Sequence, residues 1–235
     1  MIELQTPAEI FAFAQKTKDN WKDVNVPMNQ WSQAVERELV KVDNDHYEQV
    51  PPFLAFASCM EAISYESLDD AKTVLELGAS SGYYGYILDK LEYSWDYTAS
   101  DYSLAFQELA KQKYPNQKFI LADASNVPVK SNSYDIVISG CYLLHTFNWR
   151  TCMTEATRIA KEYVLFHRTP ILSDSETRYF KKEAYGIECL EIHFGKKEFY
   201  NALEDLEVKI VKDEIIFEHD TEYGRYGHHS ILVKL

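Results

Sequence analysis

Residues 73–82 read TVLELGASSG and decide how the chain is expected to fold. A mostly apolar run, 74–77, ends at Gly78, and only small residues follow as far as Gly82. Residues 83–91 then have the pattern of a helix. A strand that ends abruptly in a loop with little side-chain bulk, and then passes into a helix, lets a ligand lie against the loop backbone and the helix N-terminus. The stretch therefore predicts a site for a nucleotide-type cofactor.

Strand and helix patterns alternate from residue 72 onward. We expect strands at 73–78, 96–101, 118–123, 134–140 and 162–168, and helices at 82–91, 103–113 and 148–160. Ser103 and Asn148 are the expected N-caps of two of these helices, and Pro170 is expected to end the fifth strand. Alternation at this spacing predicts a parallel sheet with helices on both faces, the doubly wound α/β class.

The chain ends in two further strand patterns, 206–217 and 228–234, joined by a short loop with glycine. A connection of this length cannot cross back over a sheet, so the last strand is expected to run antiparallel. An insert over 171–205 precedes them. In it we expect a helix from a Ser173–Glu176 capping box to about Ala184, and another at 196–205.

The first 70 residues have helical patterns, at Pro7 and beyond, near 29–42 and over 53–65. Because they precede the first strand, we expect them to form an N-terminal helical cap rather than part of the sheet. No repeat or flexible linker interrupts the sequence. We therefore expect a single domain over 1–235, in which the cap (1–70) and the insert (171–205) contribute to the substrate site.

Composition and charge exclude several classes of protein. The 24 Lys and Arg residues against 37 Asp and Glu residues give a net charge of −13, and no basic cluster would face nucleic acid phosphates. No apolar run approaches the roughly 20 residues needed to span a bilayer. The four cysteines are widely separated, which fits reduced thiols rather than a zinc site or a disulfide framework. These features, with no signal peptide pattern, predict a cytoplasmic protein without nucleic acid or membrane partners.

Three acidic residues occupy comparable places in the predicted strands. Glu76 lies in the first strand, Asp101 ends the second and Asp123 ends the third. Ligands of an open parallel sheet bind beyond the carboxyl ends of its strands. Asp101 lies 23 residues after Gly78, the separation at which such folds place a carboxylate on ribose hydroxyls. A carboxylate suits the ribose diol and repels a phosphate, so we expect a ligand with an unphosphorylated ribose.

Two classes of cofactor contain such a ribose. A dinucleotide needs the loop G-x-G-x-x-G, but Ser80 stands at the second glycine of that pattern. The acidic Glu76 also suits a positively charged ligand better than a pyrophosphate. S-adenosylmethionine (SAM) has a sulfonium, an ammonium and a ribose without any phosphate, and is therefore favoured.

With these motifs the chain resembles the class I SAM-dependent methyltransferases over residues 72–168 and in the closing hairpin. The acid-x-Gly-x-Gly-x-Gly loop of that family aligns with Glu76, Gly78, Ser80 and Gly82, with Ser80 as the departure. The resemblance implies seven strands in the order 3-2-1-4-5-7-6. It also implies that Asp101 holds the ribose and that Asp123 and Ala124 lie at the adenine.

The segment SYDIVISGCYLLH, 133–145, resembles the family's fourth strand and the turn beside the reactive methyl group. This implies that Ser139 lies at the cofactor. His145 is our candidate general base, because imidazole titrates near neutral pH. A histidine at this point of the fold can also pack or form hydrogen bonds without catalysing. Tyr142 is a candidate to position the substrate or to face the sulfonium, and it can equally be a core residue.

Three further residues are candidates for contact with the substrate. His167 ends the fifth predicted strand, His228 begins the last one, and Arg225 lies in the loop that joins the final two strands. We do not predict a metal site, since no histidine spacing supports one.

The sequence thus predicts a SAM-dependent methyltransferase that acts on oxygen or nitrogen of a small or medium-sized acceptor. The alternatives are a catalytically silent SAM-binding protein and a dinucleotide-dependent oxidoreductase. The identity of the acceptor and the oligomeric state are left open.

Overall fold

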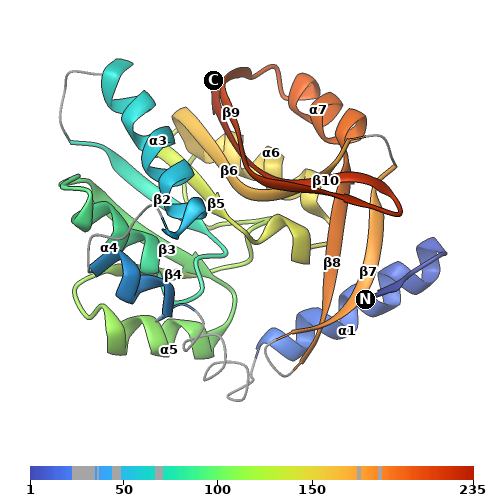
Figure 1. Cartoon of the computed structure of the whole chain (residues 1–235). Helices are drawn as coiled ribbons and strands as arrows, with labels where there is room; N and C mark the ends of the chain where they lie inside the picture. Colours follow the sequence, from blue (N-terminus) through green and yellow to red (C-terminus); the bar gives the residue numbers. More distant parts are fainter. Residues whose placement is uncertain (23–34, 36, 44–48, 67–70, 174–175, 185–186) are drawn as a thin grey trace.

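A β-sheet with helices on both faces forms the centre of the molecule (Figure 1). The computed structural model describes residues 1–22, 35, 37–43, 49–66, 71–173, 176–184 and 187–235. The parallel strands are β2 (Thr73–Leu77), β3 (Asp96–Asp101), β4 (Lys118–Leu121), β5 (Tyr134–Gly140) and β6 (Ala160–Leu172). Near the C-terminus β9 (Lys209–Thr221) and β10 (Gly224–Lys234) complete the core of the sheet.

These strands lie in the order β4-β3-β2-β5-β6-β10-β9, which is the predicted order 3-2-1-4-5-7-6. β2 pairs in parallel with both β3 and β5, so the winding of the chain reverses there. β10 pairs antiparallel with β6 and β9, which confirms the predicted antiparallel last strand. The carboxyl ends of β2 and β5 flank the crevice where ligands bind in sheets of this kind.

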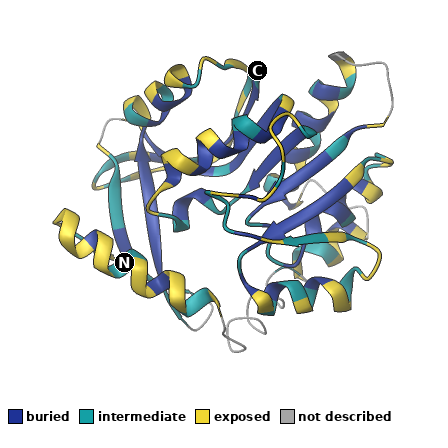
Figure 2. Ribbon diagram, turned by 180° about the vertical axis from the view of Figure 1, so that it is seen from behind, coloured by how far each residue is buried: buried dark blue, intermediate teal, exposed yellow. Residues whose placement is uncertain are grey.

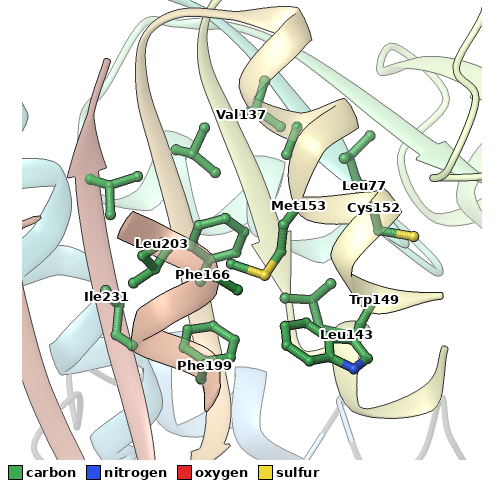
Figure 3. Packing of buried hydrophobic residues seen from close by; sticks show 14 of the residues in the cluster. Leu77, Val137, Leu143, Trp149, Cys152, Met153, Phe166, Phe199, Leu203 and Ile231 are labelled. Atoms are coloured by element: carbon green, nitrogen blue, oxygen red, sulfur yellow. The ribbon is translucent and has the colours of Figure 1, made fainter. Parts of the chain in front are cut away.

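Helices cover the two faces of the sheet with separate clusters of apolar side chains. On one face α6 (Trp149–Ile159) and α7 (Lys196–Asp205) pack against β5, β6 and β10 through residues such as Met153, Phe166 and Phe199 (Figure 3). On the other face lie α3 (Pro51–Glu66) and α4 (Tyr83–Lys90). α5 (Leu104–Lys113) follows β3, and Ser103 caps it by accepting a hydrogen bond from the Phe106 amide. Asn148 makes no such side-chain cap at α6.

The insert is where the prediction from sequence is wrong. Instead of a helix to about Ala184, the chain forms the antiparallel strands β7 (Arg178–Ala184) and β8 (Ile187–Gly195). β8 pairs with the end of β6, so these strands extend the sheet to ten strands in the described residues rather than the predicted seven. The reason is tertiary, since β8 is buried along most of its length. The predicted helix at 196–205 is confirmed as α7.

The N-terminal segment also contributes to the sheet, contrary to our expectation. β1 (Ile2–Glu3) pairs antiparallel with β7, and α1 (Pro7–Lys22) follows. α1 begins with a capping box that we did not predict, because Thr6 Oγ1 accepts from the Glu9 amide (3.2 Å) and Glu9 accepts from the Thr6 amide (3.1 Å). α1 lies along β8 with its exposed side toward solvent (Figures 1 and 2). Of the helix predicted near 29–42, residues 29–34 and 36 lie outside the described residues.

β6 is longer than predicted, because Pro170 does not end it. The strand continues to Leu172, and Pro170 pairs with His228 of β10. Proline lacks only the N–H donor, and its fixed φ is compatible with an extended strand. The extra length carries β6 past the end of β5 and toward β8.

No helix of the described residues is long and apolar enough to cross a membrane. The cytoplasmic location and the division of the chain into one domain with a cap and an insert stay predictions.

Candidate active site

A cavity of about 420 Å³ lies at the carboxyl ends of β2 to β5, with α1 forming its far wall. This volume falls within the usual range of small-molecule sites. The following residues predicted for the site line the cavity: Gly78, Ser80, Asp101, Asp123, Ala124, Tyr142 and His145. Structure thus brings the ends of four strands and the turn after β5 into one site.

The loop after β2 begins with a glycine because its backbone is left-handed there and Tyr142 leaves no room for a side chain. Gly78 has φ +64°, and a Cβ there would lie 2.5 Å from the Cβ of Tyr142. Ser80 also has a positive φ, of 50°. Its amide donates a hydrogen bond to Asp101 Oδ2 (3.0 Å). The loop is therefore held by the Asp101 side chain from the next strand, together with the Ser80 hydroxyl, which donates to the Ala79 carbonyl oxygen (2.7 Å).

Asp101 connects the two loops at the centre of the site. Its Oδ1 accepts from the Ser103 amide (2.9 Å) and its Oδ2 from the Ser80 amide. Burial raises the pKa of Asp101 to about 6, although the backbone amides counteract this effect. A carboxylate has about four acceptor positions, so Asp101 keeps capacity for hydroxyl groups of a ligand.

Asp123 follows β4 and is engaged by α1. Its carboxylate accepts from the Ser125 amide (2.9 Å) and forms an ion pair with Lys18. Burial raises the pKa of Asp123, but the bonds from Lys18 and Ser125 outweigh burial and keep the pKa below its ordinary value. Ala124 lies beside it on the cavity wall. This strand end therefore binds the N-terminal helix as well as facing the cavity.

Three residues predicted for the cofactor do not line the cavity: Glu76, Gly82 and Ser139. Glu76 is buried beneath the site and accepts a hydrogen bond from the Tyr97 hydroxyl. Burial raises its pKa well above the ordinary value, despite that hydrogen bond. A Cβ on Gly140 would lie 2.5 Å from Glu76 Oε1, so the carboxyl group fills the space under the end of β5. The roles of these three residues at the cofactor stay predictions.

His145 ends the short helix η2 (Leu143–His145) after β5. Its Nδ1 lies 2.7 Å from the Leu190 carbonyl oxygen of β8. Because a carbonyl only accepts, Nδ1 carries the hydrogen in the neutral ring and Nε2 is the basic nitrogen. Burial lowers the pKa of His145, although the Leu190 carbonyl and Glu191 oppose this. His145 is thus a neutral imidazole on the cavity wall.

The remaining candidates for substrate contact lie elsewhere. His167 is buried, with Nδ1 2.6 Å from Ser230 Oγ, and His228 Nε2 lies 2.6 Å from the Tyr226 hydroxyl. Arg225 is exposed and pairs with Asp220 (3.2 Å) near the tip of the β9–β10 hairpin. None of the three lines the cavity. We expected the hairpin loop to lie at the edge of the sheet where the ligand binds. Instead its tip packs against β7, where the Arg178 guanidinium carbon lies 4.3 Å from the centre of the Tyr223 ring.

Sequence reasoning missed the residues that close the cavity. Phe11, Lys18 and Trp21 come from α1, and Arg168 comes from β6. The Phe11 ring meets that of Phe147 edge to face at 5.8 Å, which narrows the opening with aromatic side chains. No motif marks the α1 residues as part of a site. Arg168 had one available signal, since it is a charged residue at the end of the strand predicted at 162–168.

The residues present suit SAM by their chemistry. The bare loop at Gly78 exposes backbone, and the Asp101 carboxylate beside it suits a ribose diol and disfavours a phosphate there. Among the described residues, no group of three or more His, Cys, Asp or Glu is arranged to hold a metal ion.

Comparisons with known proteins agree with this geometry. The family model described as "Methyltransferase domain" matches residues 75–166, from β2 to β6. No curated protein matches the chain.

Solved structures match the fold. A SAM-dependent methyltransferase from Clostridium acetobutylicum has a TM-score of 0.59 at 12% identity, over 86% of this chain and 99% of that one. A 1,6-didemethyltoxoflavin-N1-methyltransferase from Burkholderia thailandensis has a TM-score of 0.54 at 17% identity, over 90% and 91%. Magnesium protoporphyrin IX methyltransferase from Synechocystis PCC 6803 has a TM-score of 0.54 at 15% identity, over 90% and 84%.

At these identities the likeness to solved structures concerns the fold, and the family model covers the part of the site from the loop after β2 to the turn after β5, but not the cavity residues of α1 or Arg168. The chain is thus similar in fold to SAM-dependent methyltransferases and matches a methyltransferase family model over residues 75–166, and the comparisons leave the subfamily open.

Proposed function

We propose that this protein binds SAM in the cavity and transfers its methyl group to oxygen or nitrogen of a small or medium-sized acceptor, with His145 as general base. The observation that carries the proposal is the shared cavity of Asp101, the glycine loop and His145. The methyltransferases from Burkholderia and Synechocystis are named for a toxoflavin precursor and a porphyrin, which supports a small-molecule acceptor.

Each residue has a distinct role in this proposal. Asp101 accepts hydrogen bonds from the ribose hydroxyls, Asp123 and Ala124 lie at the adenine, and the backbone of 78–82 holds the methionine part. The sulfonium of SAM supplies an activated methyl group. The aromatic side chains at the opening exclude water and hold the acceptor in line with that group.

His145 removes the proton that the acceptor loses. Its neutral ring, bound at Nδ1 by Leu190, leaves Nε2 to accept a proton from a hydroxyl or ammonium group. Glu191 and Lys182 lie nearby on β8 and β7, and their charges act on the ring in opposite directions. The Leu190 carbonyl fixes both the tautomer and the orientation of the ring.

The cofactor assignment is tested by thermal shift and product analysis. SAM and S-adenosylhomocysteine (SAH) should raise the Tm, whereas NAD(H) and NADP(H) should not. A panel of hydroxyl- and amine-bearing small molecules should yield SAH with at least one acceptor. Binding of SAM without SAH formation across the panel would favour the catalytically silent alternative, and a shift with NAD(H) alone would favour an oxidoreductase.

The role of His145 is tested with the acceptor found in that panel. His145→Ala should lower kcat by about 10²–10⁴-fold. The base works when unprotonated, and burial lowers the pKa of His145. Wild-type kcat/KM should therefore stay constant as the pH falls past the ordinary histidine pKa, and should decrease only at more acidic pH. Added imidazole should restore part of the activity of His145→Ala, which a purely structural role would not explain. Wild-type turnover by the variant would refute the role.

A further inference from the structure

β6 contains a bulge where it passes the end of β5. Phe166 pairs with Ile231 of β10 and Thr169 pairs with His229, so His167 and Arg168 together face the single residue Ser230. Arg168 has φ +56°, in the left-handed region that residues other than glycine rarely adopt. Bulges next to binding sites redirect side chains, and Arg168 lines the cavity while its neighbour His167 does not. The strained backbone thus coincides with the placement of an arginine in the site.

Arg168 is half-buried in the cavity wall and forms no ion pair among the described residues. Its Nε is buried without a hydrogen-bond partner. In contrast, Arg158 on α6 pairs with Glu155 at 2.7 Å, and Arg178 pairs with Glu3 at 2.5 Å. Arginine stays protonated in proteins, and burying a polar N–H without a hydrogen-bond partner is unfavourable. A hydrogen-bond acceptor from outside the chain would remove this cost.

The nearest side chains do not neutralise Arg168. Burial raises the pKa of Tyr83 and of Cys141, so both are uncharged at neutral pH. Burial, and after it the charge of Arg168, lowers the pKa of His228 to about 3. Glu38 also lines the cavity. Burial acts to lower the pKa of Arg168, whereas the surrounding acidic groups, Glu38 among them, raise it above its ordinary value, yet Glu38 forms no ion pair with Arg168.

We propose that Arg168 forms an anion-binding subsite of the cavity, which takes a carboxylate or phosphate group of a bound molecule. The planar N–H donors of the Arg168 guanidinium can form paired hydrogen bonds with the oxygens of a carboxylate or of a phosphate. This inference depends on the proposed function only for which molecule carries the anionic group. Two sources have the right chemistry, the carboxylate in the methionine part of SAM and an acidic group on the acceptor. Arg168 shares the cavity with both Gly78 on the glycine loop and His145, so either source can reach it.

The first experiment measures affinity by calorimetry for SAH and for 5′-methylthioadenosine, which lacks the amino-acid part. The variant is Arg168→Met. The matched control is Arg150→Met, which removes an exposed arginine on α6 that pairs with Glu198 at 2.8 Å. If the cofactor supplies the anion, Arg168→Met weakens SAH binding about 10–100-fold and leaves methylthioadenosine within about twofold. The control binds both ligands as the wild type does.

The second experiment titrates sulfate, phosphate and acetate while the Tm is followed, with and without SAH. If the acceptor supplies the anion, SAH affinity is unchanged in Arg168→Met, and at least one anion gives a saturable rise in Tm in the wild type that the variant lacks. Should the wild type bind neither SAH nor methylthioadenosine, the proposed function fails, while the anion titration of the free protein still decides the role of Arg168.

Folding of the variant is a separate readout. Because Arg168 forms no ion pair with the described residues in the free protein, Arg168→Met should have a Tm equal to or above that of the wild type, whereas a structural arginine would lower the Tm on removal. Arg168→Lys keeps a charge without the planar fork and should show an intermediate loss of anion binding. The proposal is overturned if Arg168→Met behaves like Arg150→Met in SAH affinity and in its response to every anion.

Discussion

The two halves of the cavity are built in different ways. The glycine-loop half, formed by Gly78, Ser80, Asp101, Asp123 and Ala124, comes from three consecutive strand ends. Its main polar link, from Asp101 to the Ser80 and Ser103 amides, joins residues close to one another in the chain or on neighbouring strands.

The β6 half, formed by Cys141, Tyr142, His145 and Arg168, depends on distant segments. His145 is oriented by Leu190 of β8, and Arg168 is placed by a bulge against β10. Both Cys141 (φ +75°) and Arg168 (φ +56°) have left-handed backbone. The comparison indicates that the half we assign to the cofactor follows from the α/β core. The half we assign to the acceptor depends on contacts with β8 and β10, which follow β6 in the chain.

The largest expected effect is at Asp101. Asp101→Ala removes the proposed ribose acceptor and the carboxylate that holds two loop amides, so SAH affinity should fall about 10²–10³-fold, or about 3–4 kcal/mol. Calorimetry measures the SAH affinity of the variant and of the wild type. Asp96→Ala is the control, because Asp96 lies at the opposite end of β3 and pairs with Lys118 on the surface. Unchanged SAH affinity in Asp101→Ala would show that the glycine-loop half does not hold the ribose.

A smaller effect is expected on stability at the point where the halves meet. Gly78→Ala combines a left-handed φ with a Cβ 2.5 Å from Tyr142, and should lower the free energy of unfolding by about 2–4 kcal/mol. Chemical denaturation measures the loss. Gly195→Ala, at the N-cap of α7 with φ −62°, should cost less, about 1 kcal/mol or below, because no left-handed backbone is involved. Equal stability of the two variants would mean that Tyr142 and the loop shift at little cost to make room for the added Cβ.

The smallest effect concerns pH and probes the β6 half. Burial, followed by the charge of Arg168, lowers the pKa of His228 to about 3, with Glu191, His193 and Lys182 also acting on it. Below about pH 6.5 the unfolded chain binds a proton that the folded chain does not, so this histidine makes stability fall as pH falls.

Between pH 7 and pH 5 the contribution of His228 to that loss is about 2 kcal/mol. His228→Gln should show a loss smaller by this amount when unfolding is followed at both pH values. An identical loss in wild type and variant would indicate that His228 is accessible to water, and that the β6 half is more hydrated than the structure indicates.

The α/β core and the glycine-loop half could be predicted from the sequence. β3 and β5 begin and end at the predicted residues, and Ser103 caps α5 as expected. These features are local, because apolar runs, capping residues and loop glycines act over a few neighbours. Strand ends in a parallel sheet then meet at one edge, which is why the spacing from Gly78 to Asp101 was informative.

The insert and the place of Arg168 could not be predicted in this way, whereas Tyr142 and His145 were predicted for the site and line the cavity. Residues 178–184 contain charges that also fit a helix, and only pairing with β8 makes them a strand. Pro170 predicts the end of a strand, yet β10 carries β6 past it. Strand pairing is a long-range interaction, so its partner is invisible in a local pattern.

The sequence by itself determined the strands of the core, the loop of small residues after β2 and the acidic residue at the end of β3, because each depends on local chemistry and on spacing along the chain, while the order of the strands followed from the resemblance to a known family. Only the tertiary structure decided that Glu76 lies under the site, that α1 closes the cavity and that Arg168 points into it. These features depend on which distant segments become neighbours, and burial and unpaired charge exist only after those segments have met.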